Sequence, residues 1–281
     1  MLNFTATRPS THQGVHRRNS LQRWLVRWWP AVFADAVDAR KRMEDILAGR
    51  AVSTAFQPIR YLDTGCTAGA EALTRFPGWS VRSAAESPEA VFARAASSGC
   101  VTDLEFLAME RALHCVAALP ACLYVSVNLS PQTCLDPRIH KVIQASGVNP
   151  SRIVLELTEH SPVADYEALR ASLALLRDSG LRIAVDDTGA GFASMRHVLK
   201  LKPEFIKLDR DMVAGIDSDD AKKAFGAAMV SFANGIGAVL VAEGIETEEE
   251  LATLREIGVP AGQGYLLGRP SVRPEDWSTW T

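Results

Sequence analysis

The sequence has no long apolar run, no paired cysteines and little net charge. No stretch reaches the roughly 18 apolar residues of a membrane span, and the N-terminus lacks the apolar segment of a secretory signal. We therefore expect a cytoplasmic protein that does not enter a membrane. The net charge is −3 at pH 7 without an extended basic face, which argues against a long nucleic acid as partner.

Cysteine is scarce and scattered. The cysteines number five, which is odd, and none belongs to a C-x-x-C pair, which argues against a disulfide framework and against a structural zinc site. They are Cys66, Cys100, Cys115, Cys122 and Cys134. We expect reduced thiols, as in other cytosolic proteins.

The sequence does have enough apolar residues for a large core and a regular alternation of strand and helix patterns. Hydrophobic residues make up 47% of the 281 residues. Short apolar runs typical of strands lie at 52–59, 67–75, 123–128, 152–157, 181–186, 204–208, 238–243 and 263–267. Amphipathic helix patterns lie at 88–98, 102–118, 163–178, 218–236 and 247–257. This alternation predicts a closed, mainly parallel (β/α)8 barrel of the TIM type rather than an open sheet.

The N-terminal part differs from the rest. Residues 1–33 form a predicted tail or linker, which includes a tryptophan- and arginine-rich stretch at 21–30. A helical pattern over 34–48 leads into the barrel, so we assign 34–275 to one domain.

Polar residues stand at the ends of five predicted strands. In a parallel barrel the C-terminal strand ends meet on one face, and that face carries the active site. We therefore expect these side chains to converge there, joined by Glu71 from an early strand. The strands end in Asn128, in Glu156, in Asp186 and Asp187, in Lys207, and in Glu243.

This convergence of acids points to metal chemistry. Carboxylates that lie close together repel one another strongly unless cations neutralise them. Ligand sets made of carboxylate and amide oxygens suit Mg²⁺ or Mn²⁺ rather than zinc. Asp186 could bridge two such ions, and a pair of ions roughly 3.5–4 Å apart is typical of phosphodiester cleavage.

A series of short motifs in a fixed order makes the interpretation more specific. The chain resembles the EAL family from about residue 50 to residue 270, and the resemblance rests on the order and spacing of the motifs. The motifs are Gln57-Pro58-Ile59, Glu71-Ala72-Leu73-Thr74-Arg75, Val127-Asn128-Leu129-Ser130-Pro131, Leu155-Glu156-Leu157-Thr158-Glu159, Asp186-Asp187-Thr188-Gly189-Ala190-Gly191-Phe192, Ile206-Lys207-Leu208-Asp209-Arg210, Ala242-Glu243-Gly244-Ile245-Glu246 and Gln263-Gly264-Tyr265-Leu266.

The resemblance implies a TIM-barrel-like fold with one antiparallel strand, and an enzyme that hydrolyses cyclic di-GMP to linear pGpG. It also implies two divalent cations, Mg²⁺ or Mn²⁺. The ligands would be Glu71, Asn128, Glu156 and Asp186 for the first ion and Asp186, Asp187 and Glu243 for the second. Lys207 would stay charged among the acids and, with Glu71 and Glu243, form the catalytic set.

Other residues around this centre would bind substrate or support the ligands. Arg75 would bind a phosphate through its planar guanidinium group. Gln57, Leu73 and Gln263 would line the substrate pocket, and Glu159, Asp209 and Glu246 would support the ligands without binding metal.

The loop after Asp187 departs from the family. It reads Thr188-Gly189-Ala190-Gly191-Phe192 where relatives have Phe-Gly-Thr-Gly-Tyr. In the family this loop reports on substrate, metal and dimer state. The resemblance therefore implies a homodimer in which the loop couples the metals to a contact near residues 193–199, with an upstream sensory protein as a further partner.

Two other functions stay open. The altered loop leaves room for an EAL domain that binds cyclic di-GMP as a receptor with weak turnover, and the barrel could also serve as a protein-interaction module. The complete ligand set favours the phosphodiesterase, because neither alternative needs so many converging polar side chains.

Overall fold

The protein is described from a computed structural model, which defines residues 43–48, 52–76, 87–158, 163–188 and 192–280. The chain divides into two compact units, Met1–Ile46 and Leu47–Thr281. Residues 43–48 are helical. The predicted tail, its tryptophan-rich stretch and most of the predicted leading helix lie outside the described residues.

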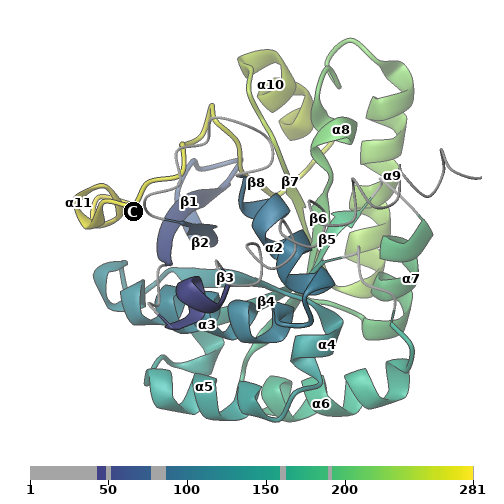
Figure 1. Cartoon of the computed structure of the whole chain (residues 1–281). Helices are drawn as coiled ribbons and strands as arrows, with labels where there is room; N and C mark the ends of the chain where they lie inside the picture. Colours follow the sequence, from purple (N-terminus) through teal and green to yellow (C-terminus); the bar gives the residue numbers. More distant parts are fainter. Residues whose placement is uncertain (1–42, 49–51, 77–86, 159–162, 189–191, 281) are drawn as a thin grey trace, which may run out of the picture. The chain divides into compact units, whose positions relative to one another are not determined.

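Eight strands close into a barrel in sequence order (Figure 1). The strands are β1 (Ser53–Tyr61), β2 (Thr67–Arg75), β3 (Tyr124–Leu129), β4 (Ile153–Leu157), β5 (Arg182–Thr188), β6 (Phe205–Leu208), β7 (Val239–Ala242) and β8 (Ala261–Gly262). Strand β1 pairs antiparallel with both β2 and β8, and the remaining neighbours pair in parallel. The prediction of a TIM-barrel-like fold with one antiparallel strand is confirmed.

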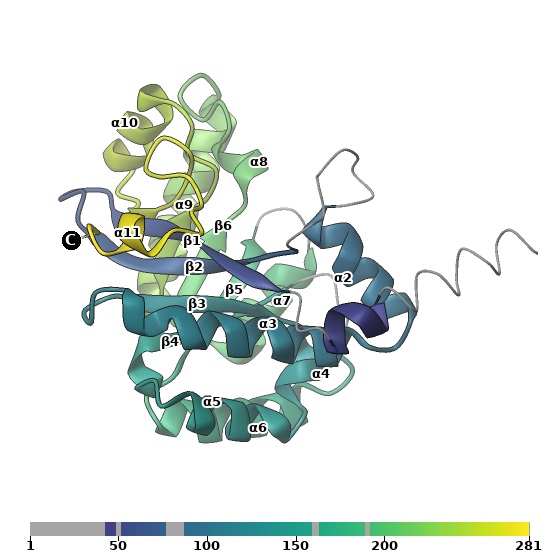
Figure 2. The same ribbon diagram turned by 60° about the vertical axis from the view of Figure 1, so that its left-hand side comes forward.

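Helices surround the barrel, and six of them form two groups on different sides of it (Figures 1 and 2). The described helices of the barrel are α2 (Pro88–Ser97), α3 (Val101–Cys115), α4 (Pro131–Cys134), α5 (Arg138–Ser146), α6 (Tyr166–Asp178), α7 (Phe192–Leu201), α8 (Arg210–Val213), α9 (Asp220–Ile236), α10 (Glu248–Glu256) and α11 (Pro274–Trp277), with 3-10 turns at Val116–Ala118 and Pro150–Arg152. Helices α3, α5 and α6 lie along one side of the barrel and α8, α9 and α10 along another (Figures 1 and 2). Each group packs on an apolar cluster formed with the outer faces of the strands.

The eighth strand differs from the prediction. The sequence pattern places a strand at 263–267, but β8 is Ala261–Gly262 and the chain turns directly after it. The N–H of Gly268 donates to the carbonyl of Gly264 (3.0 Å). Gly264 lies so close to the backbone of Ile245 that a Cβ atom would collide with it. A strand pattern alone misses this turn because the apolar residues after it pack as a loop.

Side chains inside the barrel form two layers, because residues two apart on a strand share a face. The lower layer is an apolar cluster that includes Ile59, Tyr124, Val154, Ala184, Phe205, Val241 and Ala261. The upper layer stands two residues away on the same strands and is polar: Gln57, Ser126, Glu156, Asp186, Lys207, Glu243 and Gln263. The apolar layer therefore separates the polar layer from solvent at the amino ends of the parallel strands.

An aromatic cluster completes that closure. The rings of Tyr124 and Phe205 lie with their centroids 5.2 Å apart. The guanidinium group of Arg182 lies over both rings, 5.0 and 5.1 Å from their centroids. These contacts add to the apolar layer that covers the polar layer at the amino ends of the parallel strands.

No described helix combines the length and the apolar character that crossing a membrane would require.

Candidate active site

Lys207 lies at the centre of the polar layer. The residue is 2% exposed, and its Nζ atom lies within ion-pair distance of carboxylates from β2, β4, β5 and the end of β7. The partners are Glu243 Oε1 at 2.5 Å, Glu156 Oε2 at 2.8 Å, Asp186 Oδ1 at 3.2 Å and Glu71 Oε2 at 3.3 Å. One ammonium group thus neutralises part of the charge of four buried or half-buried acids.

Glu71 is held by hydrogen bonds on both carboxylate oxygens. Asn128 Nδ2 donates to Oε1 (2.8 Å), and Gln263 Nε2 donates to Oε2 (2.7 Å). Gln263 Nε2 also donates to Glu243 Oε1 (3.0 Å), so one amide bridges the acids of β2 and β7. Both amides donate through their nitrogen atoms, so their oxygen atoms are the ones that could bind a cation.

Asp186 and Asp187 share one side of the barrel mouth, which a regular strand would not allow. Consecutive side chains on a strand point to opposite faces. Here the register between β5 and β6 shifts between Val185 and Thr188, and Asp187 adopts a left-handed backbone with φ of 51°. This bulge turns the second carboxylate toward the first. Oxygens of Asp186, Asp187 and Glu243 all lie within 4.8 Å of one another.

Lys207 and Glu71 favour their charged forms. Burial by itself would lower the pKa of Lys207, but the charges of Asp186, Glu156, Glu243 and Glu71 outweigh it and hold that pKa well above its ordinary value. Burial also acts to raise the pKa of Glu71, but the charge of Lys207 and the hydrogen bonds from two amides outweigh it, so the pKa lies below its ordinary value. The ammonium and this carboxylate therefore form a stable ion pair.

The other acids have raised pKa values. Burial raises the pKa of Glu156 to about 8, against the opposing charge of Lys207. Burial also raises the pKa of Asp187 to about 6, and repulsion from Asp186 adds to it. The pKa of Glu243 lies well above its ordinary value, again mainly because the group is buried. Without a further cation, the cluster takes up protons near neutral pH.

We expect the metal-free protein to lose stability as the pH rises toward 8. A carboxyl with a raised pKa keeps its proton in the folded state where the unfolded chain has released it, so rising pH favours unfolding. The window runs from the ordinary value of 4.5 to about 8 for Glu156, and from 3.8 to about 6 for Asp187. Urea unfolding in a chelating buffer at several pH values measures the trend.

Glu156→Gln provides the matched control for this trend, because glutamine has a similar shape and no titration. The loss of stability between pH 5 and pH 8 should be smaller in the variant than in the parent. Equal pH dependence in the two proteins would show that Glu156 does not take up a proton on folding.

The residues at the mouth fit divalent cations. Among the described residues, Asp186 Oδ1 is buried and accepts no hydrogen bond, although it lies in ion-pair contact with Lys207, and Gln263 Oε1 is buried without a hydrogen-bond partner. Every donor atom in the group is a carboxylate or amide oxygen, which is the set that hard ions such as Mg²⁺ and Mn²⁺ prefer. Of the described residues, Asp186, Asp187 and Glu243 form a group close enough to share one ion.

Residues 40–270 match the family described as EAL domain. The chain belongs to the EAL domain family. The Glu71-Ala72-Leu73 tripeptide that gives the family its name lies in β2, where its glutamate faces the barrel interior beside Lys207.

Relatives of this EAL domain include signalling proteins and phosphodiesterases. An uncharacterized signaling protein of Caulobacter vibrioides is 31% identical over 277 residues, covering 95% of this chain and 34% of that protein. PdeB of Escherichia coli, a probable cyclic di-GMP phosphodiesterase, is 28% identical over 250 residues, covering 85% of this chain and 46% of PdeB. This EAL domain therefore spans less than half the length of these two curated relatives.

The fold agrees with a solved structure that contains both metal and nucleotide. BlrP1 of Klebsiella pneumoniae, in a complex with manganese and cyclic di-GMP, has a TM-score of 0.70 to this EAL domain at 28% identity. The match covers 79% of this chain and 56% of that one.

The residues expected to bind substrate lie on β1, β2 and the turn after β8. Gln57 is buried and directly opposite Glu71 in the β1–β2 register, but its Nε2 donates to the carbonyl of Gly268 (3.0 Å). Leu73 and Arg75 are half-buried toward the end of β2, and Arg75 Nη1 donates to the carbonyl of Thr74 (3.0 Å). The amide of Gln57 therefore ties the turn after β8 to β1.

Two of the residues expected to support the ligands lie in the segments that follow β6 and β7. Asp209 is not among the four carboxylates that contact Lys207; its Oδ1 accepts the N–H of Asp211 (2.7 Å) at the start of α8, and its side chain lies beside Asp187. Glu246 forms an exposed ion pair with Arg210 (2.9 Å). Glu159 lies outside the described residues.

Some supports of the site come from outside the strand ends, and the strand pattern does not indicate them. Glu250 on α10 accepts hydrogen bonds from the backbone N–H groups of Glu246, Thr247 and Gly215. It thereby holds the loop that follows Glu243. Its position in a capping box (Thr-x-x-Glu) is the sequence signal that could have indicated this role.

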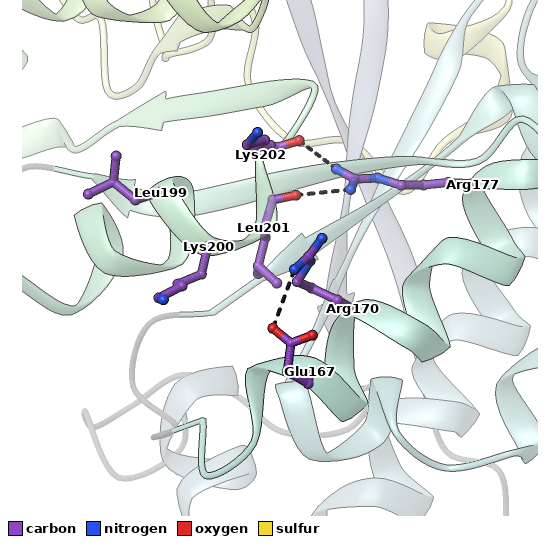
Figure 3. A pocket seen from close by; sticks show the side chains of 7 residues that line it. All are labelled: Glu167, Arg170, Arg177, Leu199, Lys200, Leu201 and Lys202. Atoms are coloured by element: carbon purple, nitrogen blue, oxygen red, sulfur yellow. Dashed lines mark hydrogen bonds and ion pairs between the residues drawn. The ribbon is translucent and has the colours of Figure 1, made fainter.

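A separate pocket lies on the surface beside α6 and α7, with a volume of about 340 Å³. Its lining residues are Glu167, Arg170, Arg177, Leu199, Lys200, Leu201 and Lys202. Figure 3 shows Lys200 pointing away from Arg170, and Arg177 donating to the carbonyls of Leu201 and Lys202. The cationic groups do not converge on one point, so this pocket lacks the organisation of the barrel mouth.

Proposed function

We propose that this EAL domain hydrolyses cyclic di-GMP to linear pGpG with two divalent cations. The observation that carries the proposal is the arrangement at the barrel mouth, where Lys207 and an oxygen-only donor set meet around Asp186. An acid placed where it could serve two ions, with a cation beside it, suits phosphodiester cleavage with two metal ions. The names of PdeB and of the BlrP1 complex support the choice of cyclic di-GMP and manganese.

The proposed ligand sets divide the carboxylates between two positions. When bound, the ions would supply an activated water and would offset negative charge on the phosphate oxygens. One set is Glu71, Asn128, Glu156 and Asp186, and the other is Asp186, Asp187 and Glu243. The short distances from Lys207 to Glu71, Glu156 and Asp186 support the first set. The close oxygens of Asp186, Asp187 and Glu243 support the second.

The protein's own side chains orient the proposed metal ligands and stabilise negative charge on the phosphate. We assign Lys207 the role of a positive charge beside the phosphate rather than of a base, because the acids around it hold its pKa above the ordinary value in the metal-free protein. Gln263 and Asn128 hold Glu71 in one orientation by hydrogen bonds. We assign phosphate contact to Arg75 and a place in the lining of the substrate pocket to Leu73. Both residues lie toward the end of β2, which supports these assignments.

The overall reaction consumes one water. Its oxygen bonds to phosphorus, the bond from phosphorus to the 3′ oxygen breaks, and that oxygen takes a proton to become a hydroxyl. The new 5′ phosphate stays on the linear product.

Incubation of the purified chain with cyclic di-GMP and Mg²⁺ or Mn²⁺ tests this function. We expect pGpG by chromatography, no product after chelation, and inhibition by Ca²⁺, because calcium prefers longer bonds and more ligands. Product formation after exhaustive chelation would refute the metal dependence.

The same assay separates the phosphodiesterase from the alternatives. Binding of cyclic di-GMP by calorimetry without any pGpG would identify a receptor. If the protein neither binds nor hydrolyses cyclic di-GMP, a protein-interaction module is the remaining alternative. Asp178→Asn, at an exposed position on α6, is a suitable control for surface changes in charge.

A further inference from the structure

Glu105 is a buried acid outside the active site. It lies on α3, is 8% exposed, and has no basic side chain within ion-pair distance in the part of the chain that the structure describes. Burying a carboxyl group without a cation is unfavourable unless hydrogen bonds compensate for the lost water. Its hydrogen bonds therefore indicate what it is there to hold.

Glu105 holds the backbone just after β3. One oxygen, Oε2, accepts hydrogen bonds from both the N–H (3.1 Å) and the hydroxyl (2.8 Å) of Ser130. Ser130 is itself buried and is the N-cap of α4, where its Oγ accepts the N–H of Thr133 (3.3 Å). A side chain from the outer helix layer thus fixes the turn between β3 and α4.

This turn begins two residues after Asn128. The pairing of β3 with β2 ends at Ala72 and Val127, so on that side Asn128 already lies beyond the ladder. On the other side β3 pairs with β4 as far as Leu129. The backbone N–H after Leu129 is that of Ser130, and it donates to Glu105. This hydrogen bond limits how far the end of β3 can move.

We propose that Glu105 is a positioning residue that sets the orientation of Asn128 through Ser130 and thereby raises the affinity of the barrel mouth for a divalent cation. The inference rests on the proposed function only in taking Asn128 as a metal ligand. Supports of this kind typically change metal affinity by about 10- to 100-fold when they are removed.

Two substitutions of similar size separate this role from general packing. Burial raises the pKa of Glu105 more than the hydrogen bonds from Thr133 and Ser130 lower it, so a neutral amide is a close substitute. Glu105→Gln keeps a carbonyl oxygen that can accept both bonds from Ser130. Glu105→Met keeps the length of the side chain and removes the acceptor.

The test is Mn²⁺ binding to the full chain without nucleotide, measured from the electron paramagnetic resonance signal of free Mn²⁺. Glu105→Met should weaken the tightest binding by about 10-fold or more, and Glu105→Gln by much less. In an Asn128→Ala background, Glu105→Met should add no further loss. Parental affinity in folded Glu105→Met, or an undiminished loss in the Asn128→Ala background, would overturn the proposal.

Met109 supplies the matched control, because it is fully buried one helical turn further along α3 and its side chain cannot accept the hydrogen bonds that Ser130 donates to Glu105. Met109→Ala should lower the unfolding temperature but leave the Mn²⁺ affinity of the folded protein unchanged. An equal loss of Mn²⁺ affinity in Met109→Ala would overturn the proposal. If Glu105→Met does not fold, Ser130→Ala replaces it, since the loss of the hydroxyl should weaken Mn²⁺ binding; parental affinity there would overturn the idea.

The outcome is independent of turnover. A parent protein that binds Mn²⁺ but does not cleave cyclic di-GMP would refute the proposed function, while the variants would still decide the role of Glu105. A parent that cleaves cyclic di-GMP with variants at parental Mn²⁺ affinity would refute the role of Glu105 alone. A parent that binds no Mn²⁺ would overturn both.

Discussion

Replacing Lys207 by methionine should destabilise the metal-free protein by about 3–5 kcal/mol, the range found when one partner of a buried ion pair is removed. The ammonium group of Lys207 contacts four acids, and methionine leaves them without a neutralising cation. The unfolding free energy in a chelating buffer measures this loss. Saturating Mn²⁺ should restore much of it, because a divalent cation neutralises the same carboxylates.

Turnover should not recover with stability. At saturating Mn²⁺ we expect Lys207→Met to hydrolyse cyclic di-GMP about 100-fold more slowly, the scale of one preorganised charge in a transition state. Lys200→Met, at an exposed position on α7, should match the parent in both measurements. A variant with parental kcat would refute the role of Lys207 in the reaction. Unchanged stability without metal would show that the lysine does not neutralise the cluster.

The convergence of the polar layer could be expected from the sequence because it follows from topology. Strands of a parallel barrel end on one face, so a polar residue at each end reaches the same mouth. Glu156, Asp186, Lys207 and Glu243 illustrate this, since each stands two residues after an apolar residue of the lower layer. Period-two alternation and strand order are enough to place them.

Local backbone geometry could not be derived in the same way. Asp187 follows Asp186 directly, and a regular strand would point it away from the site. Its left-handed backbone and the register shift after Val185 are properties of the pairing with β6. No pattern of apolar residues encodes such a bulge.

Contacts between segments that are distant in the sequence could not be predicted from the sequence either. Gln57 donates to the carbonyl of Gly268 and Glu105 accepts from Ser130, pairs separated by many residues along the chain. A polar residue in an apolar pattern indicates that it needs a partner, but which backbone group satisfies it depends on packing. This is why Gln57 is predicted to line the substrate pocket, although its amide nitrogen is bound to the turn after β8.

Replacing Asp186 by asparagine should not destabilise the metal-free protein, in contrast to Lys207→Met. It should slow turnover more than Lys207→Met does. Asp186 contacts Lys207 and also belongs to the group with Asp187 and Glu243. Its charge raises the pKa of Glu156, Asp187 and Glu243, so removing it relieves repulsion in the metal-free protein. The unfolding free energy in a chelating buffer should stay equal or increase.

Hydrolysis by Asp186→Asn should fall by about 1,000-fold or more, because losing a ligand shared by two ions removes several kcal/mol of stabilisation. Asp187→Asn, which alters a ligand of one proposed ion only, should lose less activity and serves as the matched comparison. Both are measured as initial rates of pGpG formation at saturating Mn²⁺. Equal losses in the two variants would argue against Asp186 as the shared ligand. A strong loss of metal-free stability in Asp186→Asn would show that its ion pair with Lys207 outweighs the repulsion among the acids.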